Sequence, residues 1–99
     1  MASIEQHRQE IDQLDSEILD LILKRIGHVR EIRLLKQFEQ IPQDTPEREA
    51  EILRRMVQKA DGQVSEESVR AIWNTLIREG KFTVRSEGPG KLNYKGVST

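Results

Sequence analysis

Positively charged side chains recur along the first part of the chain at spacings that could bind a small anion. An isoleucine repeats every seven positions at Ile4, Ile11 and Ile18 and again at Ile32, but Arg25 occupies the intervening position of the series. A strict seven-residue apolar repeat is typical of a helix buried along one seam. A guanidinium in such a seam is costly unless an anion meets it. That anion could be a buried acidic residue or a bound ligand.

Lys36 and the neighbouring pair Arg48 and Glu49 extend this candidate anion site. Lys36 follows Arg25 by eleven residues, so the two lie about 20° apart on one helix face and about 16 Å apart along its axis. Arg48 and Glu49 fall in the first turn of a second predicted helix, where the helix dipole adds partial positive charge. The set suits a carboxylate or phosphate ligand, although Arg48 could instead pair with Glu51.

Arg8 lies too far along the first helix to join this site within one chain. It precedes Arg25 by seventeen residues and lies about 100° around the helix from it. The predicted helix, from Ser3 to about Gln40, would be about 55 Å long, whereas a compact chain of this size has a radius of gyration of about 13 Å. We therefore expect self-association through this helix, and an antiparallel partner could bring its Arg8 to the site.

Two shorter helices complete the predicted all-α fold. The segment 41–44 interrupts the first helix, and Thr45 followed by Pro46 reads as the N-cap and first position of a second helix. That helix ends near residues 60–62, where Gly62 is a plausible C-terminal residue, and Ser65 caps a third helix. Its predicted buried face comprises Val69, Ile72, Trp73, Leu76, Ile77, Gly80 and Val84. We expect one helical domain over residues 1–87 and a flexible tail or linker stub over residues 88–99.

The composition restricts the classes of function. The 99 residues include 16 basic and 17 acidic side chains, 35% apolar residues and no cysteine. The near-neutral charge gives no reason to expect nucleic acid as a partner, and no stretch reaches membrane-spanning length. Disulfides and cysteine-bound metals are excluded, and the two histidines, His7 and His28, lack a carboxylate cluster that would make a metal site. We expect a soluble cytoplasmic protein without a metal or cofactor.

The charged residues also form a recognisable pattern. It consists of Arg8-x-x-Ile11-Asp12-x-Leu14-Asp15, Ile18-Leu19-x-Leu21-x-x-x-Arg25, Ile32-x-x-x-Lys36 and Pro46-Glu47-Arg48-Glu49. In this order and spacing the chain resembles the all-helical (AroQ) class of chorismate mutases from residue 8 to about residue 84. The resemblance implies an intertwined three-helix homodimer that converts chorismate to prephenate in the shikimate pathway.

The resemblance also implies a role for each charged residue. Arg25, with Arg8 of the partner chain, would bind the two substrate carboxylates, and Lys36 would donate to the ether oxygen whose C–O bond breaks. Arg48 would help to hold a carboxylate, and Glu49 would accept from the C4 hydroxyl. The rearrangement is pericyclic, so catalysis would come from holding the reactive conformer and stabilising charge on the ether oxygen.

Two positions of the third helix depart from the family pattern. Val84 falls where the family has a Gln or Glu that donates to the ether oxygen, and Gly80 falls where a Ser often contacts the substrate hydroxyl. Three interpretations follow: a slow mutase that an activating partner enzyme could improve, an enzyme acting on a relative of chorismate, or a degenerate dimerisation or regulatory module. The relatives considered are aminodeoxychorismate, whose C4 ammonium would suit Glu49, and isochorismate, with loss of pyruvate.

Overall fold

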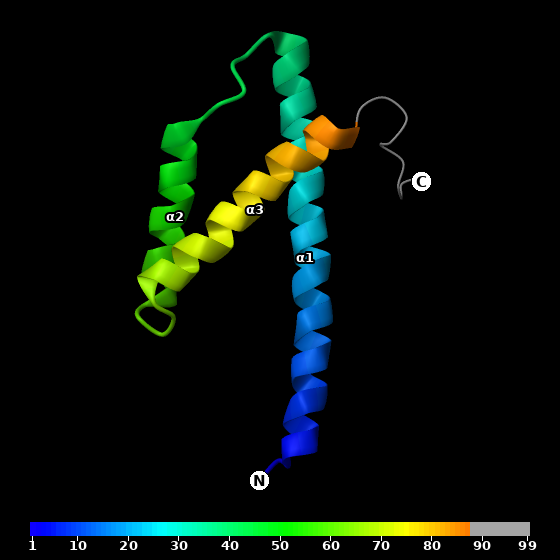
Figure 1. Ribbon diagram of the computed structural model, residues 1–99, viewed down its shortest axis with the longest axis vertical. Helices are drawn as coiled ribbons and strands as arrows, with labels where there is room; N and C mark the ends of the chain where they lie inside the picture. Colours follow the sequence, from blue (N-terminus) through cyan, green and yellow to red (C-terminus); the bar gives the residue numbers. More distant parts are fainter. Residues whose placement is uncertain (88–99) are drawn as a thin grey trace.

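Three helices make up the structure (Figure 1). The computed structural model describes the backbone of residues 1–87 and the side chains of residues 1–81. Within that backbone the helices are α1 (Ile4–Glu39), α2 (Pro46–Ala60) and α3 (Glu66–Glu87), and there is no strand. The prediction of an all-α chain with one long and two shorter helices is therefore confirmed. The predicted tail, residues 88–99, lies outside the described residues.

Local side-chain chemistry explains where two of the helices begin. The Ser3 hydroxyl accepts a hydrogen bond from the Gln6 backbone N–H at 3.1 Å, and the Gln6 side chain accepts from the Ser3 N–H at 2.7 Å. This reciprocal pair is a capping box. At the start of α3 the Ser65 hydroxyl accepts from the backbone N–H of Ser68 at 3.1 Å. Thr45 occupies the predicted N-cap of α2 but makes no capping hydrogen bond, so α2 relies on a proline at its start.

The helices end close to the predicted positions. Asp61, not Gly62, takes the left-handed cap position of α2 (φ 52°), and Gly62 follows, also at positive φ (78°). Gln40 ends α1 in the same conformation (φ 61°). Aspartate tolerates the left-handed region better than most residues, which allows the chain to turn one residue earlier than the glycine suggested.

Helix α3 packs against both of the other helices and crosses the C-terminal half of α1 (Figure 1). Gly80 of α3 is buried at this crossing, where an added Cβ would lie 3.0 Å from Cγ1 of Val29. The missing side chain thus lets the two helices approach closely. Val69 is the core residue of the described part, with 4% of its surface exposed. Ile72 was predicted to be buried, but it is 49% exposed because nothing in a single chain covers that side of α3.

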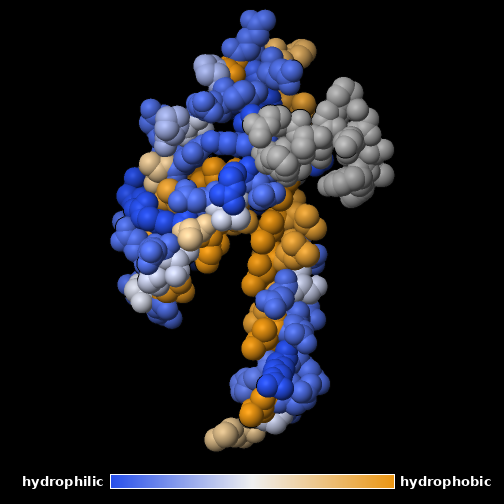
Figure 2. All heavy atoms as spheres, viewed as in Figure 1, coloured by the Kyte–Doolittle hydropathy of each residue, from blue (hydrophilic) through white to orange (hydrophobic). Residues whose placement is uncertain are grey.

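The N-terminal half of α1 extends away from α2 and α3 (Figure 1). As a result the chain measures 56 × 33 × 15 Å and has a radius of gyration of 16.8 Å, against about 13 Å for a compact chain of this length. The apolar side chains of this half form a stripe along the helix (Figure 2), which we call the open seam and define as Ile4, Ile11, Leu14, Ile18 and Leu21. Each of these side chains is more than half exposed.

Exposed apolar area of this kind is unfavourable in water and is commonly covered by another protein surface. No helix of the described residues is both long enough and apolar enough to cross a membrane.

Candidate active site

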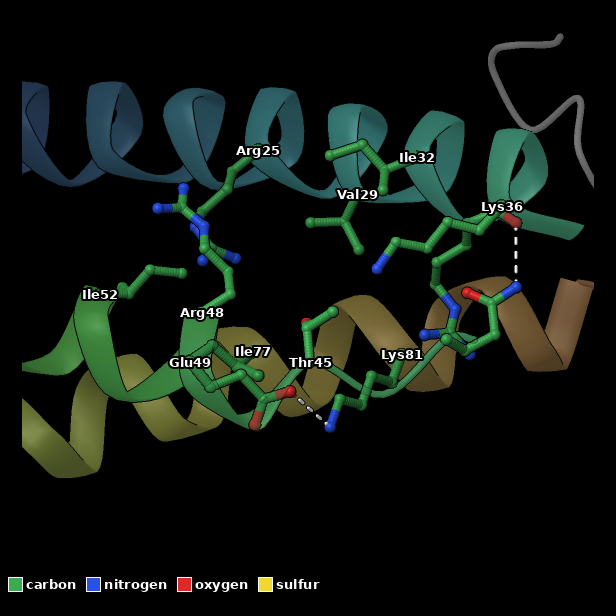
Figure 3. Close-up of a pocket in the computed structure, with 12 residues that line it drawn as sticks. Arg25, Val29, Ile32, Lys36, Thr45, Arg48, Glu49, Ile52, Ile77 and Lys81 are labelled. Carbon is green, nitrogen blue, oxygen red and sulfur yellow. Dashed lines mark hydrogen bonds and ion pairs between the residues drawn. The ribbon is translucent and has the colours of Figure 1, made fainter. Parts of the chain in front are cut away.

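A cavity of about 200 Å³ lies where the C-terminal half of α1 faces α2 and α3 (Figure 3). Its apolar lining comes from all three helices and comprises Val29, Ile32, Ile52 and Ile77. Its polar lining adds the connecting segment between α1 and α2 and comprises Arg25, Arg33, Lys36, Gln43, Thr45, Arg48, Glu49 and Lys81. The cavity has the size for a small molecule, and its polar groups converge from different elements, as in ligand sites generally.

Positive charge dominates this cavity. Five lining side chains are cationic, namely Arg25, Arg33, Lys36, Arg48 and Lys81. Among the described residues, Glu49 is the acidic side chain that lines the same space. A cavity with this balance of charge favours an anion with more than one negative charge.

Arg25 is a partly buried cation of this cavity, and its surroundings disfavour its charge. Burial, followed by the charge of Arg48, lowers the pKa of the Arg25 guanidinium from its ordinary value. Its Nη1 atom is buried and has no hydrogen-bond partner within the described part of the chain. The sequence left open that a buried acidic residue neutralises Arg25. No such residue contacts its Nη1 atom in the part that the structure describes. Figure 3 shows the side chains of Arg25 and Arg48 directed toward each other from α1 and α2. Two adjacent guanidinium groups, of which Arg25 has an unpaired donor, match the planar geometry of a carboxylate.

The other charged residues of α2 are partly engaged within the protein. Arg48 donates to Glu51 at 3.0 Å and, chiefly through this hydrogen bond, lowers the pKa of the Glu51 carboxyl. The pairing considered from the sequence therefore forms while Arg48 still lines the cavity. Glu49 pairs with Lys81 of α3, whose Nζ lies 2.8 Å from Glu49 Oε2. This second pair joins α2 to α3, and both of its residues line the cavity.

A comparison with known families assigns the chain. A family model described as chorismate mutase type II matches residues 7–82. The chain belongs to this family. The match covers α1 from residue 7 onward, α2 and the part of α3 that lines the cavity, so the recognition made from the charge pattern is confirmed. Searches of curated proteins and of solved structures gave no match.

The residues to which the resemblance gives a role in the site can now be compared with the residues that line the cavity. Arg25, Lys36, Arg48 and Glu49 all line the one cavity. Arg8 does not: it lies on the exposed N-terminal half of α1, about 25 Å along the helix axis from Arg25. Gly80 packs against Val29 at the helix crossing and is not among the lining residues. The side chain of Val84 lies outside the described residues.

The polar residues Arg33, Lys81 and Gln43 line the cavity but were not predicted to belong to the site. Arg33 lies four residues after Val29 and three before Lys36, so the helical period could have revealed it. Lys81 likewise follows Ile77 by four residues on α3. Gln43 had no such signal, because its position depends on the path of the connecting segment. Its Nε2 donates to the Arg33 carbonyl at 3.1 Å, while its Oε1 is buried and has no partner within the described part.

The lining of this cavity suits binding and electrostatic stabilisation. It includes no serine, cysteine or histidine, and the carboxylate of Glu49 is paired with Lys81. In the part of the chain that the structure describes, no group of three or more potential metal-ligating residues is present. The arrangement can hold a compact polyanion and stabilise negative charge that develops on it.

Proposed function

We propose that two copies of this chain form an intertwined homodimer that rearranges chorismate to prephenate. The observation that carries the proposal is the cavity in which Arg25 and Lys36 of α1 meet Arg48 and Glu49 of α2, in a chain of the chorismate mutase family. Chorismate carries two carboxylates, and the cavity offers an excess of cations over anions. The reaction would take place in the shikimate pathway and would require no cofactor.

Each residue has a role that its position supports. Arg25, with its free Nη1 donor, binds one substrate carboxylate, and Arg48 beside it helps to hold that group. Lys36 donates to the ether oxygen, and Glu49 accepts from the C4 hydroxyl. In one cyclic step the ether C–O bond breaks while a C–C bond forms, and no proton is transferred. The protein accelerates this step by holding the substrate compact and by stabilising charge on the oxygen.

Arg8 completes the site from the partner chain. Within one chain it is exposed and far from the cavity, on the same half of α1 as the open seam. Covering the open seam with the α1 of a second copy removes apolar area from water, which favours association. The same association would bring a second arginine to the substrate, so the dimer and the active site depend on each other.

We further propose that turnover is slow for this family. Val84 falls where the resemblance implies an amide or carboxyl donor to the ether oxygen, and valine cannot donate. The loss of one preorganised donor typically costs about 10²–10³ in rate. Lys36 is then the main donor, and a partner enzyme that repositions α3 could raise the rate. Val84→Gln should increase kcat for chorismate, whereas Val84→Leu should not.

Mixing two inactive variants tests the shared site directly. Arg8→Ala and Arg25→Ala chains are each assayed alone with chorismate, following prephenate by NMR, and then unfolded together and refolded as a mixture. Each variant alone should be nearly inactive. A hybrid dimer restores one complete site, so random pairing should return about a quarter of the wild-type activity.

Three results of this experiment contradict the proposal. If the wild-type protein forms no prephenate, the activity is wrong. If the mixture stays as inactive as its components, Arg8 does not act across an interface. If sedimentation shows a monomer that still turns over chorismate, the intertwined homodimer is wrong.

A further inference from the structure

Lys81 forms a cross-helix ion pair inside the cavity. Its Nζ lies 2.8 Å from Oε2 of Glu49, and the two side chains are 39% and 29% exposed (Figure 3). The pair joins α3 to α2, whereas the Arg48–Glu51 pair lies within α2 and is more exposed. A half-buried pair is screened less by solvent and salt than a surface pair. The cavity therefore has a fixed cation on its acidic side.

This ion pair changes what Glu49 can bind. Among the described residues Glu49 is the acidic side chain of the cavity, and Lys81 already compensates its charge. A neutral hydroxyl can donate to the second carboxylate oxygen without disturbing the pair. An ammonium in the same place would share one carboxylate with the Lys81 ammonium and would face the other lining cations. Such a juxtaposition of like charges is strongly unfavourable in a partly buried site.

We infer that Lys81 is a specificity-determining residue that makes the cavity select a ligand with a neutral C4 hydroxyl over one with a C4 ammonium. The inference rests on the proposed function, which assigns the C4 substituent to Glu49. It separates chorismate from aminodeoxychorismate, the relative whose ammonium would otherwise suit a free Glu49. Lys81 acts here through charge, by occupying the carboxylate that a cationic substituent would need.

The test compares two ligands that cannot react. In the 1-carboxyethyl ethers of the chorismate and aminodeoxychorismate rings the enolpyruvyl double bond is reduced, so the two compounds bind without rearranging and differ only at C4. Isothermal titration calorimetry gives Kd for both compounds with the wild-type dimer and with Lys81→Met. The wild-type protein should bind the hydroxyl compound at least about tenfold more tightly, and Lys81→Met should reduce this ratio about tenfold.

Two control variants separate charge from folding. Lys81→Arg retains the cation and should retain the preference for the hydroxyl compound. Lys59→Met makes the same change on the exposed last turn of α2, outside the cavity lining, and should leave both Kd values unchanged. Circular dichroism of each variant verifies that the helices are intact, and if Lys81→Met fails to fold, Lys81→Gln replaces it.

The outcomes for Lys81 and for the mutase proposal are distinct. Equal affinity for the two compounds in the wild-type protein, an unchanged ratio in Lys81→Met, or binding of neither compound overturns the role of Lys81. Chorismate turnover is measured in parallel. Absence of prephenate together with the expected change in the Kd ratio would overturn the mutase activity and leave the selectivity of the cavity in place.

Discussion

The two halves of α1 carry the same apolar repeat but lie in different environments. Every residue from 1 to 21 is exposed, including the whole open seam. Between residues 25 and 36 the chain covers α1 in part. Arg25, Val29, Arg33 and Lys36, which line the cavity, are partly buried, whereas Ile32, a member of the repeat, and Leu35 are 50% and 55% exposed. The repeat therefore identifies a face that requires covering in both halves, and within one chain only the flank of its second half meets another part of the protein.

Arg25 marks the boundary between these halves. It stands at a position of the repeat that isoleucine occupies elsewhere, and it is the first residue of α1 to line the cavity. At this position of the repeat, a cation that lines the cavity replaces an apolar residue. The comparison can be tested by altering each half separately.

Arg25→Leu restores the apolar repeat and should remove activity while leaving the fold intact. If this partly buried cation binds a substrate carboxylate as proposed, its loss should reduce kcat/KM about 10³-fold. The midpoint of thermal unfolding should stay the same or rise, because leucine removes an incompletely paired guanidinium from the seam. Steady-state kinetics with chorismate and a thermal scan measure both. A large fall in unfolding midpoint would mean that Arg25 is a structural residue.

Leu14→Glu places a charge in the open seam, far from the cavity of its own chain. If a second α1 covers this seam, the variant should shift toward monomer in analytical ultracentrifugation, and kcat/KM should fall about 10²-fold because Arg8 is no longer supplied. Gln9→Glu adds the same charge to the opposite face of α1 and should change neither property. An unaltered dimer with Leu14→Glu would mean that the open seam is not the interface.

Gly80→Ala and Gly27→Ala make the same change on α3 and α1 in different surroundings. Gly27 has open space where a Cβ would stand, so alanine there should raise the free energy of unfolding by up to about 1 kcal/mol. At Gly80 the new methyl group would lie 3.0 Å from Cγ1 of Val29. The change in the free energy of unfolding should therefore be about 1–3 kcal/mol less favourable than at Gly27. Urea unfolding of both variants measures the difference. Equal gains in stability would show that the helix crossing tolerates a side chain.

Ser3→Ala should have the smallest effect. It removes the capping box at the exposed start of α1, which should lower the free energy of unfolding by about 1 kcal/mol or less and leave kcat unchanged. Ser16→Ala makes the same change in the middle of the helix, where alanine favours helix formation, and should not destabilise. Hydrogen exchange of the first turn reports the lost cap, and identical exchange in Ser3→Ala would exclude a role for the hydroxyl.

The fold was largely predictable because its signals are local. The apolar repeat, the Ser3 and Ser65 caps and the proline at position 46 each act within one turn of helix, and all three helices begin where these residues indicate. The burial of Ile72 was mispredicted because burial depends on contacts beyond the element itself. The sequence marks an apolar face, but it does not say whether the same chain or another covers it.

Those lining residues of the cavity that follow the local helical period were also predictable from the sequence. Arg25, Lys36, Arg48 and Glu49 were found from helical spacing and from their motif, and the structure brings them to one cavity. Lys81 and its pairing with Glu49 were missed, since they depend on how α3 crosses α2. The turn that carries Gln43 into the cavity depends on the path between α1 and α2, which no periodicity encodes.

The continuity of α1 has a consequence for how such a protein would respond to dilution. The open seam and one wall of the cavity belong to the same unbroken helix, α1. If two copies associate as proposed, a ligand that binds only the complete site also stabilises the associated form. By mass action the apparent affinity for substrate would then rise with protein concentration, and substrate would in turn hold the two copies together. The cellular abundance of the protein would thus set its activity more steeply than in proportion to the number of chains.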